Sequence, residues 1–413
     1  MRENKIKKRA VWFITLVMFV ALYLFDNGSW GNYVFGGCAA LVFLVGVVLG
    51  RKTTSIVVRP FYIFILCFSI YCLSSYLWAW EPSAALDQAK RMFLILLCFA
   101  MVYLYYEKQD NIDALLDCIM WGGYVVSIYA IFAFGGVESV FSMLIAGHRP
   151  NAEETFINVN VLGMLGAVAG IIQIYKMVNE KKFLSSVLLI PTIIIIALTQ
   201  SKKAILMLII GAVLIAVSRG VTAGKGFKIL KVAIALLIVF VVGYYVINLE
   251  IFSGLRDRFN DMFSTMSGED QTEGTSTWER MKFIEIGMAQ FWDTPILGVG
   301  IGSSKALLLQ KYGEYTYLHN NYVELLACGG IVGFAIHYSM YVYLLYNLIK
   351  YRRYDVQRAD FCIILIIVLL VTDYGFVSYN VKSQYFYLAT FFIQVDLLKR
   401  AANRKEALTT LTL

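Results

Sequence analysis

The sequence predicts an all-α protein that crosses a membrane many times. Of its 413 residues, 59% are hydrophobic and only 15% are charged, a composition outside the range of soluble globular domains. Apolar runs of about 15 to 25 residues recur along the whole chain, and a run of about 20 residues crosses a hydrocarbon core of about 30 Å.

These runs form two groups of helices separated by a polar segment. We predict nine transmembrane helices in residues 1–248, an extracytoplasmic loop at 249–320, three further helices in 321–397 and a cytoplasmic tail at 398–413. The total is about twelve, or ten to eleven if the shortest runs do not span. The predicted spans lie at about 10–25, 33–49, 60–78, 92–106, 112–134, 157–178, 184–199, 203–218, 228–248, 321–349, 361–375 and 383–397.

The basic residues predict how the chain is oriented. Lys5, Lys7, Lys8 and Arg9 precede the first apolar run, which lacks a small-residue cleavage pattern and is therefore expected to remain as a helix. With the N-terminus cytoplasmic, most of the 36 Lys and Arg residues fall in cytoplasmic segments, as the positive-inside rule requires. Both termini are then cytoplasmic and the long loop faces outward. These flanks explain the net charge of +8 through contacts with anionic membrane lipids, so nucleic acid is not expected as a partner.

The long polar loop is the most informative segment, because a long extramembrane loop in a compact membrane protein usually has a function. Within it, residues 277–292 place apolar side chains at near-helical spacing, which predicts an amphipathic helix lying on the membrane with Thr277 as its N-cap. A glycine run at 298–302 follows no βαβ strand, so it indicates close approach of backbone to a ligand or another helix rather than dinucleotide binding. The loop ends at His319, one of three histidines, and Arg280 could approach it from the other end of the loop.

Polar residues at the predicted outer ends of helices are candidates for function, because a charge in the bilayer is costly unless it is paired or lines a wet cavity. Arg149 lies in one outer loop, and Asn160 follows at the start of the next apolar run, where an asparagine also serves as a helix N-cap. Trp78 and Trp80 lie in another outer loop and are interpreted as interface anchors rather than a sugar platform.

A tight outer turn carries two adjacent lysines, Lys202 and Lys203. Lysines on the outer side oppose the positive-inside trend and indicate contact with an anion. Snorkelling of their long side chains to the interface explains them equally well.

Disulfide and metal chemistry are not predicted. The seven cysteines all fall within predicted helices, no CxxC pair occurs, and the acidic first half of the long loop has no carboxylate pair placed to hold a divalent ion. His337, in the middle of a predicted helix, is interpreted as a packed polar residue. Gly329, Gly330 and Gly333 are interpreted as sites of close helix packing.

Taken in order, several motifs resemble the O-antigen polymerase/ligase family, which comprises Wzy-type polysaccharide polymerases and WaaL-type ligases and has a GT-C-like layout. The resemblance covers about residues 60–395 in layout and is strong over 295–333. The motifs are Asn-x-Asn-x-Leu-Gly at 158–163, Thr-x-Ser-Lys at 199–202, Pro-x-Leu-Gly-x-Gly-x-Gly at 295–302, His-Asn-x-Tyr at 319–322 with Glu324, and Gly-x-x-Gly at 330–333.

The resemblance implies transfer of a saccharide from an undecaprenyl-pyrophosphate carrier at the outer face of the bacterial cytoplasmic membrane. It assigns His319 to the acceptor hydroxyl and Arg280 and Arg149 to the pyrophosphate. Lys202 stands where the family commonly has Arg, which forms a bidentate fork that Lys lacks. The remaining candidates for binding pyrophosphate or glycan are Lys203, Asn160, Asn320 and Glu324.

The chemistry of these residue types is compatible with that implication. Lipid-linked pyrophosphate is a good leaving group, so cations that neutralise its developing charge could replace a metal, and no cofactor is expected. A histidine suits general-base work on a sugar hydroxyl. A single displacement would invert the anomeric centre.

The favoured interpretation is polymerisation of lipid-linked oligosaccharide repeat units into a capsular, exopolysaccharide or O-antigen-type glycan, alongside partners such as a flippase and a chain-length regulator. One alternative is a ligase that transfers a finished glycan to another acceptor. Another is a lipid-linked oligosaccharide flippase or transporter, a class that places ionisable residues near the bilayer midplane. Asp117 and Asp373 are the residues here that a transporter would use; a purely structural role is the least supported.

Overall fold

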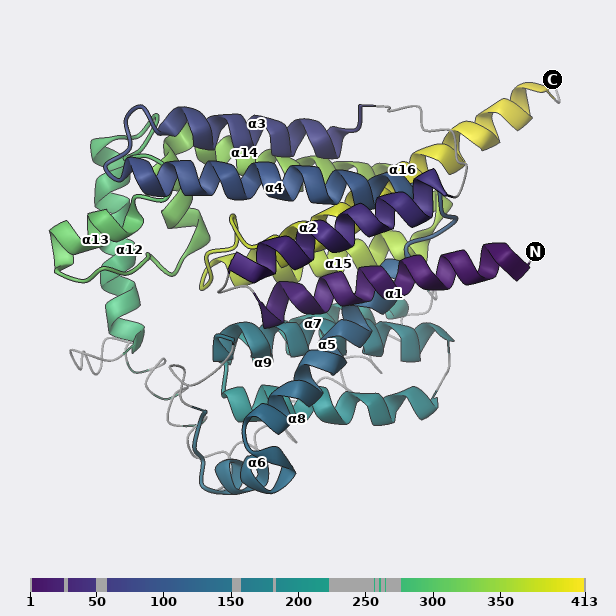
Figure 1. Cartoon of the computed structure of the whole chain (residues 1–413), viewed down its shortest axis with the longest axis horizontal. Helices are drawn as coiled ribbons and strands as arrows, with labels where there is room; N and C mark the ends of the chain where they lie inside the picture. Colours follow the sequence, from purple (N-terminus) through teal and green to yellow (C-terminus); the bar gives the residue numbers. More distant parts are fainter. Residues whose placement is uncertain are drawn as a thin grey trace.

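The computed structural model describes residues 2–25, 29–49, 58–150, 157–180, 183–222 and 276–411, with Arg256, Asn260 and Ser264 placed singly. Within these ranges all regular structure is helical. The long helices pack side by side in one bundle, and consecutive ones run in opposite directions (Figure 1).

The bundle helices are α1 (Arg2–Leu24), α2 (Ser29–Phe43, continued by a π-helical turn at Leu44–Val48), α3 (Pro60–Ser75), α4 (Pro82–Tyr106), α5 (Asp113–Ala133), α7 (Val159–Glu180), α8 (Leu189–Thr199, after a 3-10 turn at Phe183–Leu188), α9 (Lys202–Thr222), α14 (Asn321–Tyr351, followed by a 3-10 turn at Arg352–Tyr354), α15 (Val356–Asp373) and α16 (Lys382–Leu411). Two further helices, α12 (Ser276–Asp293) and α13 (Ser304–Tyr312), pack against each other at one end of the bundle, and α6 (Gly136–Ile145) lies apart from them beside α5 and α8 (Figure 1).

The helical membrane class predicted from the sequence is confirmed. Every predicted span that falls within the described ranges coincides with a bundle helix, and the span at 228–248 lies outside them. In the described part of the chain, five helices are long and apolar enough to cross a membrane: Trp30–Val48, Pro82–Tyr106, Asp113–Ala133, Val159–Asn179 and Asn321–Tyr354. The total of twelve spans stays a prediction. The structure also adds α6 and α13 in segments that the sequence predicted as loop.

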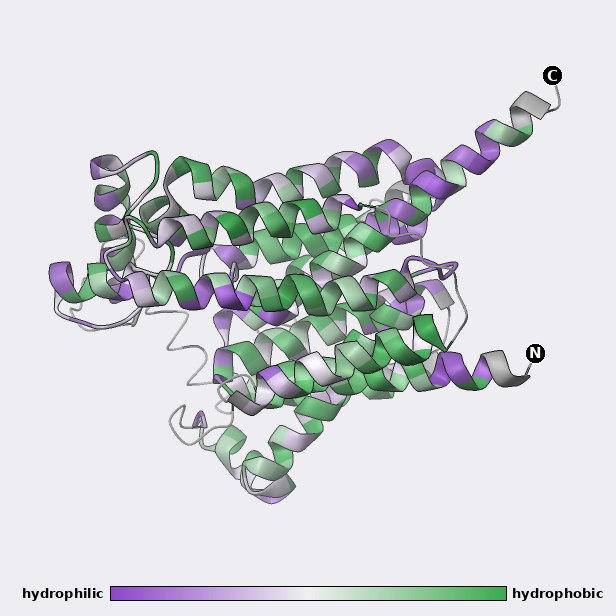
Figure 2. Ribbon diagram, turned by 45° about the horizontal axis from the view of Figure 1, so that its top comes forward, coloured by the Kyte–Doolittle hydropathy of each residue, from purple (hydrophilic) through white to green (hydrophobic). Residues whose placement is uncertain are grey.

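The two ends of the bundle differ. The loop end, defined here by α12 and α13, lies opposite the terminal end, which carries both chain termini (Figure 1). Hydrophobic residues dominate the middle of the helices, and hydrophilic residues gather toward both ends (Figure 2). This layout is the one expected of helices that cross a bilayer, where apolar surface faces lipid and polar groups reach water.

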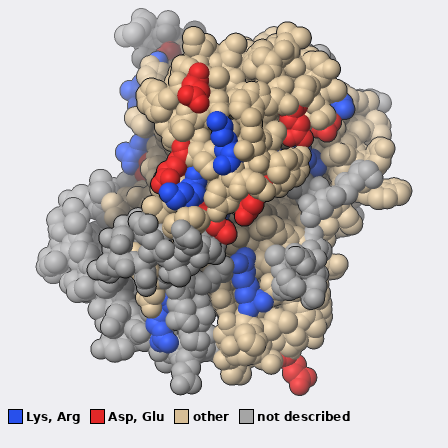
Figure 3. All heavy atoms as spheres, turned by 90° about the vertical axis from the view of Figure 1, so that its left-hand side faces the viewer, with Lys and Arg blue, Asp and Glu red and all other residues tan. Residues whose placement is uncertain are grey.

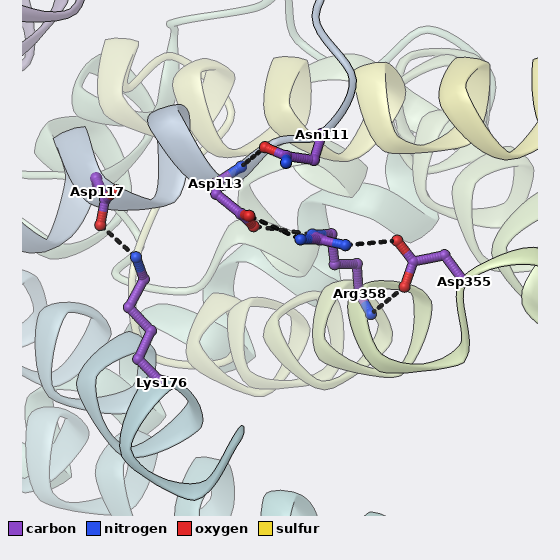
Figure 4. Close-up of polar contacts among 6 residues, drawn as sticks. All are labelled: Asn111, Asp113, Asp117, Lys176, Asp355 and Arg358. Atoms are coloured by element: carbon purple, nitrogen blue, oxygen red, sulfur yellow. Dashed lines mark hydrogen bonds and ion pairs between the residues drawn. The ribbon is translucent and has the colours of Figure 1, made fainter. Parts of the chain in front are cut away.

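At the terminal end, charged side chains pair with one another. Arg358 of α15 forms ion pairs with Asp113 of α5 (2.7 Å) and with Asp355 (3.0 Å), and Lys176 of α7 pairs with Asp117 (Figure 4). These pairs join the starts of α5 and α15 and the end of α7. Asp117, which a transporter would use, therefore has an ordinary structural partner at the edge of the bundle.

Helix α14 is broken at Gly330, whose φ of 55° and ψ of −168° lie in a region that essentially only glycine adopts. The glycine run of the preceding segment also needs positive φ, with 64° at Gly298, 96° at Gly300 and 88° at Gly302. A Cβ on Gly298 would lie 2.5 Å from the Cys328 carbonyl carbon. The glycine run thus brings backbone against a helix, as one of the two sequence interpretations proposed.

The two glycine-dependent segments satisfy each other's backbone groups. The amides of Val299 and Gly300 donate to carbonyls of α14 just before the break, at 3.0 and 2.9 Å, and the Ile331 amide just after it donates to the Pro295 carbonyl at 2.8 Å. Broken helices at membrane depth need such partners, because lipid offers none. Close helix packing therefore explains Gly329 and Gly333, which abut Ile301 and Tyr71, but it is an incomplete account of Gly330.

Replacing Gly330 with alanine should destabilise the protein more than an ordinary helix substitution. The positive φ costs a non-glycine residue about 1–3 kcal/mol, and the new Cβ would lie 2.3 Å from the Ile296 carbonyl oxygen. We expect a lower midpoint of thermal unfolding for the detergent-purified Gly330→Ala protein. The matched control is Gly37→Ala in α2, where a Cβ meets nothing within 4 Å. Equal midpoints for the two variants would contradict the proposed requirement for glycine at the break.

Candidate active site

A small hydrophobic core holds the segments that carry the candidate site residues. Phe283 of α12 packs with residues of α13 and of the start of α14, all buried: Leu307, Leu308, Leu318, Val323 and Ala327. Burial of each such side chain stabilises the fold by about 1.5–3 kcal/mol. The core fixes α12, which bears Arg280, against the chain that leads from His319 into α14.

His319 adopts a left-handed backbone conformation, with φ of 57°, directly before α14. Its ring lies 4.0 Å from the Tyr317 ring and 6.1 Å from the nearly parallel Phe283 ring, measured between centroids. The ring is partly buried, and no hydrogen bond joins it to another described residue.

The surroundings of His319 favour its neutral form. Burial, and then the charges of Arg280 and Lys203, lower the pKa of His319 to about 3. The imidazole is therefore neutral at physiological pH. A negatively charged ligand beside the two cations would offset their fields and raise this pKa toward neutrality.

Arg280 and Lys203 meet near His319 from distant parts of the sequence. Each forms no hydrogen bond or ion pair with another described residue, although the Lys203 ammonium lies 5.9 Å from the Phe376 ring. Lys203 is within electrostatic range of both Arg280 and Arg149. Burial lowers the pKa of Arg280, but a guanidinium remains charged at neutral pH.

Arg149 joins this group from the segment after α6, and its guanidinium donates to the Asn160 side chain at 3.1 Å. Among the described residues, Glu279 is the carboxylate whose charge acts on Arg280. Three cations therefore gather at the loop end, and both basic and acidic side chains are visible on that face (Figure 3). Such a cluster suits a ligand that carries at least two negative charges.

Two of the predicted binding residues form scaffold contacts instead of reaching toward the cations. The buried Asn320 caps α14, because its side chain accepts a hydrogen bond from the Val323 amide at 3.1 Å. The buried Glu324 accepts hydrogen bonds from the Ser304 hydroxyl at 2.5 Å and from the Leu318 amide at 3.1 Å. A direct role in substrate binding stays a prediction for both residues.

Lys203 of the α8–α9 turn acts on His319. A role for Lys202 stays a prediction. Thr277, predicted as an N-cap, lies inside the first turn of α12, which begins at Ser276, so that assignment is wrong. His337 is fully buried between Phe68 and Tyr341, which confirms its interpretation as a packed residue.

Asn321, next to the predicted residues, docks another segment on the site. Its side-chain oxygen accepts hydrogen bonds from the Ser378 and Tyr379 amides at 2.9 and 3.0 Å, and its amide group donates to the Tyr338 hydroxyl at 2.8 Å. Tyr338 in turn donates to Asp373 at 3.0 Å. These contacts hold the α15–α16 connection beside the start of α14.

Asn321 belongs to the His-Asn-x-Tyr motif, which drew attention to this segment. The motif alone does not identify the residues that Asn321 binds. Asp373 lies in the last turn of α15 and accepts hydrogen bonds from Tyr338 and Ser378. Its place at the loop end and its complete set of partners do not fit the midplane ionisable residue that a transporter would use.

Comparison with known protein families finds one match. Residues 185–338 match the family model described as O-antigen ligase. The resemblance predicted from the sequence is therefore confirmed, and the matched range contains Lys203, Arg280 and His319, while Arg149 and Asn160 lie outside it. No curated protein matches the chain.

The lowered pKa of His319 predicts how the free energy of unfolding depends on pH. Because the folded state lowers this pKa from about 6.5 to about 3, the unfolded chain takes up a proton between these pH values that the folded protein does not. The free energy of unfolding should therefore fall as pH drops through this window. In detergent, His319→Gln should lose less thermal stability than wild type between pH 7.5 and pH 5. Equal losses of thermal stability in the two proteins would mean that folding does not lower the pKa of His319.

Proposed function

We propose that the protein is a membrane glycosyltransferase that polymerises undecaprenyl-pyrophosphate-linked oligosaccharide repeat units at the outer face of the bacterial cytoplasmic membrane. The observation that carries this proposal is the approach of Arg280 and Lys203 to the neutral ring of His319, with Arg149 within electrostatic range of Lys203. A pyrophosphate diester supplies negative charge for Arg280 and Lys203. The match to the O-antigen ligase family model supports a role in glycan assembly.

The proposed reaction is one displacement at the anomeric carbon of the donor. An acceptor hydroxyl oxygen forms a bond to this carbon while the bond from the carbon to the pyrophosphate oxygen breaks, so the anomeric centre inverts. His319 accepts the hydroxyl proton, and the carrier leaves as lipid pyrophosphate. Arg280, Lys203 and Arg149 stabilise the charge that develops on the leaving oxygen, and in this scheme no divalent metal is required.

Donor binding prepares the base in this scheme. Before donor binds, His319 has a pKa of about 3 and is a weak base. Pyrophosphate between the cations raises that pKa, because it compensates the charges of Arg280 and Lys203. Efficient general bases have a pKa near the working pH, so the ring becomes effective only when donor is present.

A ligase reaction is the second candidate, and it is favoured by the description of the family model that residues 185–338 match. Polymerase and ligase use the same type of donor and differ in the acceptor. Purified protein given only lipid-linked repeat units distinguishes them: a polymerase produces a ladder of longer glycans, and a ligase produces product only when a different acceptor is added. A flippase has little support, because Asp117 and Asp373 both have structural partners near the ends of the bundle.

Substitution of His319 and Arg280 should impair different steps. His319→Ala should still bind lipid-linked donor but lose turnover by about 10²- to 10⁴-fold, the usual contribution of a general acid–base group. Arg280→Lys keeps the charge but loses the fork of donors, so donor affinity should fall together with rate, and Arg280→Ala should be worse. Donor binding and polymer output are measured on purified protein with EDTA present throughout, because no metal is proposed.

The matched control is Arg353→Ala. This exposed arginine lies at the terminal end and hydrogen-bonds Tyr354, so the variant should polymerise like wild type. A folded His319→Asn protein with wild-type output would refute the assignment of His319 as base. Loss of turnover with EDTA, restored by magnesium, would refute the proposal that the cations alone neutralise the leaving group.

The outward orientation is tested by labelling cysteines in intact cells. Glu314, an exposed residue after α13, lies at the loop end, and Arg353 lies at the terminal end. In a background where the exposed Cys67 is replaced by serine, Glu314→Cys should react with a membrane-impermeant thiol reagent and Arg353→Cys should react only after lysis. The reverse pattern would place the site in the cytoplasm, where the proposed donor is not presented.

A further inference from the structure

A polar cavity of ≈ 190 Å³ lies beside the His319 site at the loop end. We call it the Gln88 cavity. The side chains that matter here come from α4, α13, α14 and the segments next to them: Gln88, Lys305, Tyr317, Glu324, Tyr379 and Asn380.

Tyr317 joins this cavity to the cation cluster. Its ring lines the cavity and also lies 4.0 Å from the His319 ring. The charge of Arg280 acts on the Tyr317 phenol as well. A molecule in the Gln88 cavity therefore lies one aromatic ring away from the group proposed to accept the proton.

Several polar groups in the cavity have no internal partner. The side-chain oxygen of Gln88 is buried and accepts no hydrogen bond from a described residue. The side chains of Asn380 and Lys305 form no hydrogen bond or ion pair in the described part of the chain, and the Lys305 ammonium lies 5.2 Å from the Tyr315 ring. A buried amide oxygen left without a partner destabilises the folded state, and a bound hydroxyl would remove that cost.

Glu324, the acid that lines the cavity, already has hydrogen-bond partners. Its two oxygens accept hydrogen bonds from Ser304 and from the Leu318 amide. Its carboxylate disfavours a second anion, whereas the neutral amides of Gln88 and Asn380 each offer both a donor and an acceptor. The cavity is thus chemically distinct from the nearby cation cluster.

We propose that the Gln88 cavity binds one sugar ring of the acceptor glycan and turns its hydroxyl toward His319. This inference rests on the proposed glycosyltransferase function. Hydroxyl groups match the paired donors and acceptors of Gln88 and Asn380, and the partly exposed ring of Tyr317 suits the apolar C–H face of a sugar. The volume is below the roughly 300–1,000 Å³ of pockets that take drug-sized ligands, so it suits a single ring.

The test uses a probe without pyrophosphate. Lipid-linked repeat units are extracted from cells that lack this protein, and mild acid releases the oligosaccharide from the carrier. The soluble oligosaccharide is then varied as acceptor at a saturating concentration of intact lipid-linked donor. In Gln88→Ala and Asn380→Ala, the KM for the oligosaccharide should rise at least tenfold while the KM for the donor stays within twofold of wild type.

Two further variants serve as controls for these KM values. Gln357→Ala removes an exposed glutamine at the terminal end and should leave both KM values unchanged. Arg280→Ala should raise the KM for the donor more than that for the oligosaccharide. Because the Gln88 side chain makes no hydrogen bond within the described residues, its removal should leave the melting temperature close to wild type, and Asn380→Ala tests the same cavity from another segment.

Equal changes in the two KM values, or no change in either, would overturn the assignment of the cavity. So would a wild-type protein for which the oligosaccharide is neither an acceptor nor a competitive inhibitor of polymerisation. Failure of the proposed function has a different signature, since wild type would then form no product from lipid-linked donor with any acceptor. The two failures are therefore distinguishable in one set of assays.

Discussion

The break in α14 is the constraint on which the loop end depends. A helix interrupted at Gly330 exposes backbone amides and carbonyls that a bilayer cannot satisfy, and the segment at 295–300 supplies their partners. The same segment is tied to the α3–α4 connection, because the Trp80 amide donates to the Val299 carbonyl at 2.9 Å. Tyr71 adds a hydrogen bond from α3 to the Gly329 carbonyl at 2.5 Å. The chain that leads to His319 therefore starts from a fixed backbone platform.

Arg280 and Lys203 at the loop end differ from the paired cations of the terminal end. At the terminal end, cations pair with acids: Arg358 with Asp113 and Asp355, and Arg59 with Glu107 at 2.8 Å. At the loop end, Arg280 and Lys203 have no such partner among the described residues and act on the same imidazole. Paired cations stabilise helix ends, whereas a group of like charges stores repulsion that an anion relieves. The difference locates the site by electrostatics, independently of the motifs.

Much of this arrangement could be predicted from the sequence, and the exceptions have physical causes. Apolar runs gave the helices because hydrophobic length is a local property, and the order of the motifs gave the family. The structure also brings Arg280 close to His319, as the loop layout anticipated. The break at Gly330 could not be predicted, because a positive φ there depends on a segment about 30 residues earlier in the chain. Likewise, the scaffold contacts of Asn320 and Glu324 could not be predicted, because the sequence does not reveal the amides and the hydroxyl that they bind.

The shared ring of Tyr317 has a thermodynamic consequence. The proposed anion site lies on one side of Tyr317 and the Gln88 cavity on the other, so the same side chain borders both. If filling one compartment displaces this ring, the affinity of the other must change by a factor that is identical in both directions, because coupling free energies are reciprocal. A single aromatic side chain would then couple the occupancy of the two compartments without any separate regulatory site.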